Sequence, residues 1–205
     1  MRTNAFIPTI LAAACFAGPA SAKDGSRQIQ TSPEFEVTVY VVQSCQTPDV
    51  EKVALATAAQ LFARIDVLIR FVHAEPPRND ADAIVLRFVE RAPGGTGPYV
   101  LGAAWVNGKP WPQANVYCDR VMAFHDSRDC RESGRLLGYA AAHELGHVLR
   151  TEPGHSPAGV MRACWRQRDI LPMLQGAVAF LPADAERIRE ARAKRQTLLA
   201  RAGEN

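Results

Sequence analysis

The chain has 205 residues, which is enough for one well-buried domain and short for two. Its 24 lysines and arginines and 21 acidic residues leave a formal net charge of +3 at pH 7, and the basic residues are scattered. A nucleic-acid-binding surface needs a concentrated basic patch, so this balance argues against a nucleic-acid partner.

Residues 1–22 predict a secretory signal peptide. Arg2 supplies a positive start, 5–17 form a short apolar core, and the small residues at 20–22 form a cleavage site. The apolar run is too short to span a bilayer comfortably, so stable membrane insertion is not expected. A lipid anchor on Cys15 is an alternative, although that signal normally has a larger aliphatic residue three positions earlier. We expect cleavage after residue 22 and a secreted or periplasmic protein.

The polar stretch 23–34 predicts a flexible leader, and a single domain is expected over 35–205. Its first segment, 35–43, is rich in β-branched and aromatic residues, which favours a strand. Pro48 then begins a predicted helix that runs to about Ile65, because its apolar residues recur at helical spacing.

The same criteria predict four more strands and two more helices. The strands are expected at 67–73, 83–90, 99–106 and 114–122. The helices are expected at 132–149 and 182–200, with an irregular segment at 151–164 between them. A strand, a helix, four strands and then helices indicate an α+β domain.

Four cysteines remain once Cys15 is removed with the signal peptide. An even number in an exported chain suggests two disulfides, for which three pairings are possible. Proximity in sequence favours Cys118–Cys130, which leaves Cys45–Cys164 as the long-range pair. The alternative is four buried free thiols.

The segment AAHELGHVLR carries a candidate metal site. His143 and His147 are four residues apart on a predicted helix, so both imidazoles lie on one side and can reach one metal ion. Glu144 is rotated by about 100° from His143. A carboxylate placed in this way can take a proton from a water molecule that the metal activates.

Most apolar residues of this helix lie on a different face, although Leu136 falls on the histidine side two turns earlier. Leu137, Leu145 and Val148 cluster roughly 135° from the midpoint of the two histidines, at about 100° per residue. One face can therefore enter the core while the other lines a cleft. The alternative is a structural helix whose histidines have no ligand.

A catalytic zinc site needs a third protein ligand and one open position. His155 is the candidate, because Pro153 and Gly154 can end the helix and turn the chain back towards the metal. Glu152 is the alternative third ligand. The expected cofactor is therefore Zn2+.

This segment resembles the metzincin zinc peptidases. The resemblance rests on HELGHVL, a third histidine and the downstream Met161, and the strand LGAAWV with the pair His155-Ser156 is similar to the matrixin branch. It spans about 35–164. It implies a zincin-like fold with a five-stranded mixed twisted sheet, two main helices and a C-terminal helix. One departure stands out: the family pattern HExxHxxGxxH places glycine at position 150, where this chain has Arg150, and its third histidine two residues earlier than here.

By the same resemblance, His143, His147 and His155 are the zinc ligands and Glu144 is the general base. Met161 is then the methionine of the turn beneath the metal. These roles predict a secreted zinc metallopeptidase that hydrolyses internal peptide bonds of peptide or protein substrates with metal-activated water. The related enzymes bind substrate along the strand that corresponds to 99–106, by β-strand addition.

Two other functions remain open. One is an exported non-catalytic binding module that retains a peptidase-like fold, and the other is a zinc hydrolase of a non-peptide amide. The stabiliser of the oxyanion has three candidates, which are Arg162, Tyr139 and His125. The sequence does not indicate an oligomeric state.

Overall fold

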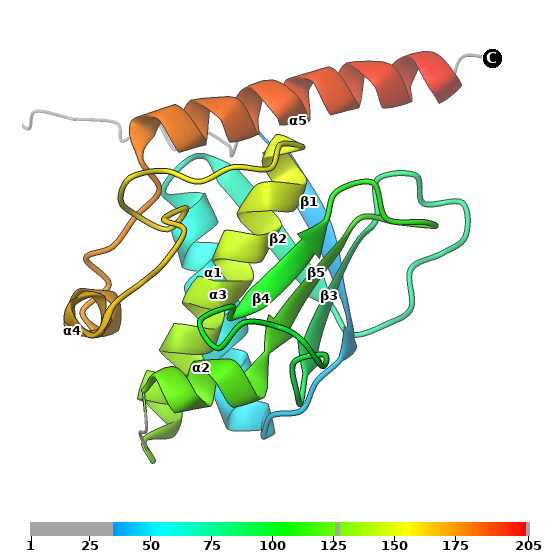
Figure 1. Ribbon diagram of the computed structural model, residues 1–205. Helices are drawn as coiled ribbons and strands as arrows, with labels where there is room; N and C mark the ends of the chain where they lie inside the picture. The colour runs from blue at the N-terminus through cyan, green and yellow to red at the C-terminus, as the bar shows by residue number, and fades with distance from the viewer. Residues whose placement is uncertain (1–34, 126–127, 204–205) are drawn as a thin grey trace, which may run out of the picture. The chain divides into compact units, whose positions relative to one another are not determined.

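The computed structural model describes residues 35–125 and 128–203 (Figure 1). The predicted signal peptide at 1–22 and leader at 23–34 lie outside the described residues. Among the helices of the described part, none is both long enough and apolar enough to cross a membrane.

A five-stranded mixed sheet underlies the fold, with the strand order β2-β1-β3-β5-β4. The strands are β1 (Phe35–Gln43), β2 (Val67–Val72), β3 (Ile84–Val89), β4 (Gly102–Trp105) and β5 (Gln113–Tyr117). The first four in this order pair in parallel, and β4 pairs antiparallel with β5 at one edge. The predicted α+β fold with a five-stranded mixed sheet is confirmed.

Two helices cover one face of this sheet. α1 (Pro48–Ala63) and α3 (Cys130–Arg150) lie side by side against it (Figure 1). Buried residues alternate with more exposed ones along β1, as expected of a strand that buries one face. Val39 of β1, Phe62 of α1 and Leu137 of α3 are among the largest fully buried side chains and belong to one core.

Glycines allow α3 to approach α1 closely. A Cβ at Gly134 would lie 2.7 Å from the carbonyl oxygen of Val50, and a Cβ at Gly138 would lie 2.5 Å from that of Ala54. A larger residue at either position would push the helices apart. Because α3 carries the histidine pair, this contact helps to set where its last turns project.

Two predicted strands are too long. β5 ends early and α2 (Cys118–Phe124) follows it, so the second half of the strand predicted at 114–122 is wrong. Cys118 and Val121 are both buried and are three residues apart, which is the spacing of one helix face. β4 is also shorter than the strand predicted at 99–106.

Like α2, a second helix was not predicted. α4 (Gln167–Leu174) is short and contains Pro172, which counts against a helix when only the sequence is known. The Asp169 carboxylate accepts a hydrogen bond from the backbone nitrogen of Arg166 at 2.7 Å, which stabilises the first turn. α5 (Pro182–Gly203) then closes the described chain as expected.

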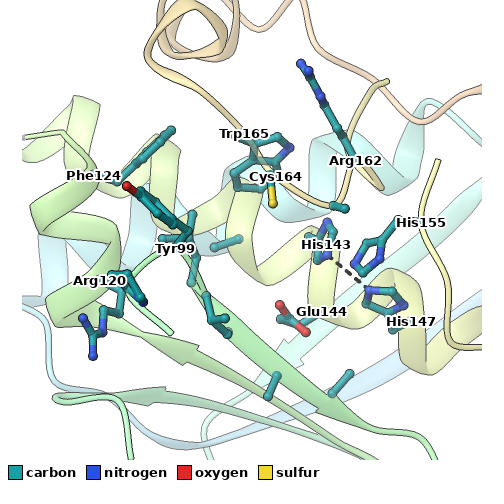
Figure 2. Close-up of a pocket in the computed structure, with 18 of the residues that line it drawn as sticks. Tyr99, Arg120, Phe124, His143, Glu144, His147, His155, Arg162, Cys164 and Trp165 are labelled. Carbon is teal, nitrogen blue, oxygen red and sulfur yellow. Dashed lines mark hydrogen bonds between the residues drawn. The ribbon is translucent and has the colours of Figure 1, made fainter. Parts of the chain in front are cut away.

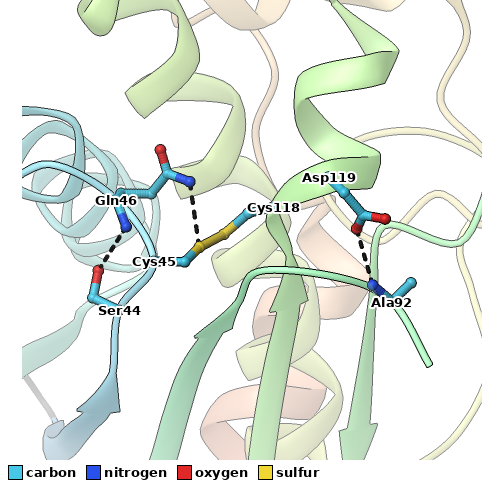
Figure 3. The surroundings of a disulfide bond; sticks show 6 residues. All are labelled: Ser44, Cys45, Gln46, Ala92, Cys118 and Asp119. Carbon is cyan, nitrogen blue, oxygen red and sulfur yellow. Dashed lines mark hydrogen bonds between the residues drawn. A yellow bond between two sulfur atoms is a disulfide. The ribbon is translucent and has the colours of Figure 1, made fainter.

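The disulfide joins Cys45 to Cys118, so the predicted pairs Cys118–Cys130 and Cys45–Cys164 are wrong (Figure 3). Cys45 follows β1 and Cys118 follows β5. Because β1, β3 and β5 run parallel, their carboxyl ends lie at the same end of the sheet. Cys130 and Cys164 are free and exposed, which also departs from the alternative of four buried thiols.

Replacing Cys45 and Cys118 together by alanine should lower the free energy of unfolding by roughly 2–5 kcal/mol. The disulfide links residues 73 positions apart, and its loss frees the unfolded chain. Urea unfolding followed by circular dichroism measures the change. The control replaces Cys130 and Cys164 by serine and should keep the wild-type midpoint. An equal fall in both proteins contradicts the assigned pairing.

Candidate metal centre

Three histidines converge at the end of α3 (Figure 2). His143 and His147 lie one turn apart on α3, and their Nε2 atoms are 3.2 Å apart. His155 comes from the loop that follows the helix, and its ring stacks on that of His143 with a centroid separation of 5.3 Å. One donor atom from each histidine lies within 4.8 Å of the others. The structure therefore brings together the three residues predicted as ligands.

The backbone orients His143. Its Nδ1 lies 2.7 Å from the carbonyl oxygen of Val160. A carbonyl can only accept a hydrogen bond, so Nδ1 carries the proton and Nε2 presents its lone pair to the cluster. Sequence reasoning did not find Val160, because a backbone carbonyl has no signature in residue types.

His147 has two polar partners beside the other histidines. Its Nδ1 lies 3.2 Å from a guanidinium nitrogen of Arg150, from which it can accept a hydrogen bond. The ring also hydrogen-bonds to the backbone of Glu152. Its Nε2 faces Nε2 of His143 at 3.2 Å and is the atom that points into the cluster. The Glu152 carboxylate is not among the donors grouped with the three histidines, so the alternative ligand gains no support.

All three imidazoles are neutral near pH 7. Burial is the main cause in each case, and it lowers the pKa of His143 to about 3 and that of His147 to about 4. Burial also lowers the pKa of the more exposed His155, and the nearby charge of Arg150 acts in the same direction. Neutral imidazole is the form that binds metal ions, so the cluster is ready to do so without losing protons.

Glu144 is buried beside the edge strand. A Cβ at Gly102 would lie 2.7 Å from both Cγ and Oε1 of Glu144, so only glycine leaves room for this carboxylate. Burial raises the pKa of Glu144 to about 8. A bound dication acts in the opposite direction, because a nearby positive charge favours the carboxylate.

Met161 lies directly against the histidine turn of α3. It is fully buried, and a Cβ at Gly146 would lie 2.5 Å from its sulfur atom. The backbone oxygen of Met161 accepts a hydrogen bond from the backbone nitrogen of Ser156 at 2.8 Å, which closes the loop on itself. The predicted methionine thus packs against the turn of α3 that joins His143 to His147.

A cleft of about 860 Å³ opens beside the histidines (Figure 2). Its walls come from β4 and the residues before it, from α2, and from the segment 162–167 after Met161. The side chains of Phe124 and Trp165 supply apolar wall, and Arg120 and Arg162 supply positive charge. Glu144 reaches the same cleft. The arrangement can hold an extended chain beside a metal ion and a carboxylate.

The three oxyanion candidates are placed differently. Tyr139 is buried and donates its hydroxyl hydrogen to the carbonyl of Val178 at 3.1 Å. His125 lies 3.1 Å from a carboxylate oxygen of Glu132. Of the three candidates, Arg162 is the one that lines the cleft, and there its guanidinium is paired with the Asp169 carboxylate at 3.0 Å.

The sequence matches no protein-family model and no curated protein sequence. Solved structures are similar to it. An archaemetzincin from Methanopyrus kandleri is 16% identical with a TM-score of 0.50, over 76% of this chain and 95% of that one. A zinc-dependent peptidase from Methanocorpusculum labreanum is 14% identical with a TM-score of 0.52, over 73% of this chain and 99% of that one.

At these identities the likeness establishes the fold alone, and the chain shares the fold of these two structures. The zincin-like architecture expected from the metzincin resemblance is confirmed. Its closer likeness to the matrixin branch stays a prediction.

Alanine variants of His143, His147 and His155 should each bind zinc much more weakly than wild type. Loss of a residue that only hydrogen-bonds to a ligand costs roughly 10–100-fold in affinity, and loss of the ligand itself should cost more. Dialysis against buffered zinc, followed by elemental analysis, measures the metal retained. His73→Ala and His125→Ala serve as controls, because these histidines pair with carboxylates elsewhere. Equal zinc content in all five variants contradicts the assigned cluster.

Proposed function

We propose that this protein is an exported zinc-dependent endopeptidase of a matrixin-like kind. The observation that carries the proposal is the convergence of three neutral imidazoles beside a buried glutamate, at the wall of an open cleft. Three imidazoles with one open position form a ligand set of catalytic zinc sites. The zinc-dependent peptidase fold of the structural neighbours supports the same cofactor.

The residues present fit a zinc ion. His143 would bind through Nε2, since its Nδ1 is held by Val160, and His147 would bind through Nε2, which faces Nε2 of His143. His155 would complete the set from the loop. When bound, zinc supplies Lewis acidity, which lowers the pKa of water and polarises a carbonyl.

Glu144 performs the proton transfers in this proposal. Its carboxylate takes one proton from the attacking water as the oxygen bonds to the carbonyl carbon. The same proton then passes to the leaving nitrogen as the C–N bond breaks. The buried position of Glu144 beside Gly102 holds it at the cleft wall and limits competing contact with bulk water.

The substrate would bind along β4. This strand is at the edge of the sheet and pairs with β5 on one side, so its other side can accept an extended peptide. The adjoining wall, with Phe124 and Trp165, favours an apolar side chain near the scissile bond. The disulfide between Cys45 and Cys118 supports an oxidising compartment, in keeping with export.

Glu144→Gln should lower kcat for a mixed peptide library by about 10²–10⁴-fold, because the amide cannot accept the proton. Zinc content should stay at the wild-type value, since Glu144 is not a ligand. Mass spectrometry of the digested library measures cleavage.

Glu152→Gln is the matched control for this experiment. It makes the same chemical change on an exposed loop residue close to the site and should retain activity. Zinc binding without cleavage by wild type and Glu144→Gln alike would favour the non-catalytic binding module.

A further inference from the structure

Arg150 is a buried cation at the end of α3. Its side chain is 2% exposed, and the metzincin pattern, which has glycine at this position, does not account for it. A buried charge is costly unless it is paired. The fully buried carboxylate of Asp184 lies 3.3 Å from the guanidinium, and the more exposed Arg187 lies 3.9 Å from the same oxygen. The Arg150–Asp184 pair therefore joins the last residue of α3 to the first turn of α5.

The same pair binds both ends of the loop that carries His155. On one side, Nε of Arg150 donates to the carbonyl oxygen of Glu152 at 3.3 Å. On the other side, Oγ of Ser156 donates to Oδ1 of Asp184 at 2.7 Å, which is the oxygen that Arg150 also contacts. The loop 151–155 is thus tethered at each end to one ion pair.

This loop has little burial of its own. All five of its residues are exposed, and exposed loops are ordinarily the mobile parts of a fold. It turns back through Thr151, at φ 56°, and Gly154, at φ 121°, both in the left-handed region. Because threonine is disfavoured there, this turn needs contacts from outside the loop to hold it.

We propose that Arg150 and Asp184 are positioning residues of the metal site. Through Glu152 and Ser156 they hold the loop in the form that places His155 over the other two histidines. The proposal rests on the proposed zinc function and explains how a third ligand two residues further along than the family pattern reaches the same centre. A preorganised loop binds the metal ion more tightly, since its ordering cost is met during folding.

The test is the zinc affinity of Asp184→Asn and Ser156→Ala, measured by competition with a chromophoric chelator. Each variant should bind zinc about 10–100-fold more weakly than wild type, as outer partners of ligands do. Ser156→Ala removes the loop tether while the ion pair stays intact, so it keeps the test decisive if Asp184→Asn does not fold. Cobalt(II) spectra should also change in the variants, because a displaced His155 alters the coordination geometry.

Asp82→Asn is the matched control. Asp82 pairs with the buried Arg192 of α5 at 3.0 Å, so the variant breaks a second ion pair to the same helix. Its zinc affinity should stay within about 2-fold of wild type even where its unfolding midpoint falls. Unchanged affinity in Ser156→Ala and Asp184→Asn overturns this proposal alone, whereas a wild-type protein that holds no zinc overturns the proposed function with it.

Discussion

The last turns of α3 place imidazoles, a carboxylate and a guanidinium in the interior, and burial of such groups costs free energy unless each finds a partner. The carbonyl of Val160 accepts a hydrogen bond from His143, the backbone of Glu152 hydrogen-bonds to His147, and Asp184 pairs with Arg150. These partners come from the chain that follows α3. The helix end, the loop and the start of α5 therefore hold these histidines and Arg150 together.

The fold could be predicted where composition or spacing gives a clear local signal. The strand at 35–43 follows from its β-branched and aromatic residues, and the helix around 132–149 from helical spacing. The strand predicted at 114–122 extends into α2 because residues 118–122 follow β5 with no glycine or proline between them and include the β-branched Val121. The disulfide could not be predicted. Proximity in sequence favours Cys130 as the partner of Cys118, whereas the parallel strands bring Cys45 to the same end of the sheet as Cys118. Pairings of this kind are set by topology, which the local pattern does not contain.

For the candidate site, the spacing of His143 and His147 and the turn before His155 were enough to predict that three imidazoles converge. The supporting groups were not predictable in the same way. Gly102 matters because the Glu144 carboxylate occupies the space of its missing side chain, a contact between residues far apart in sequence. Residue type and spacing identify donors that share one helix, whereas the groups that orient them are backbone atoms or distant side chains.

The buried Arg150–Asp184 pair needs a reason other than stability, because apolar residues of similar volume often stabilise a core as well or better. An apolar pair could fill the space between α3 and α5, but it could offer no donor to the Glu152 carbonyl and no acceptor to Ser156. Directional contacts specify one loop conformation, and burial raises their strength relative to water. Desolvating the two charges costs free energy, and in return the pair selects the loop conformation in which His155 faces the cluster. The longer spacing before His155 and the buried Arg150 then belong together. A loop with two additional residues has more conformations, and the contacts of Arg150 exclude those that turn His155 away from the cluster.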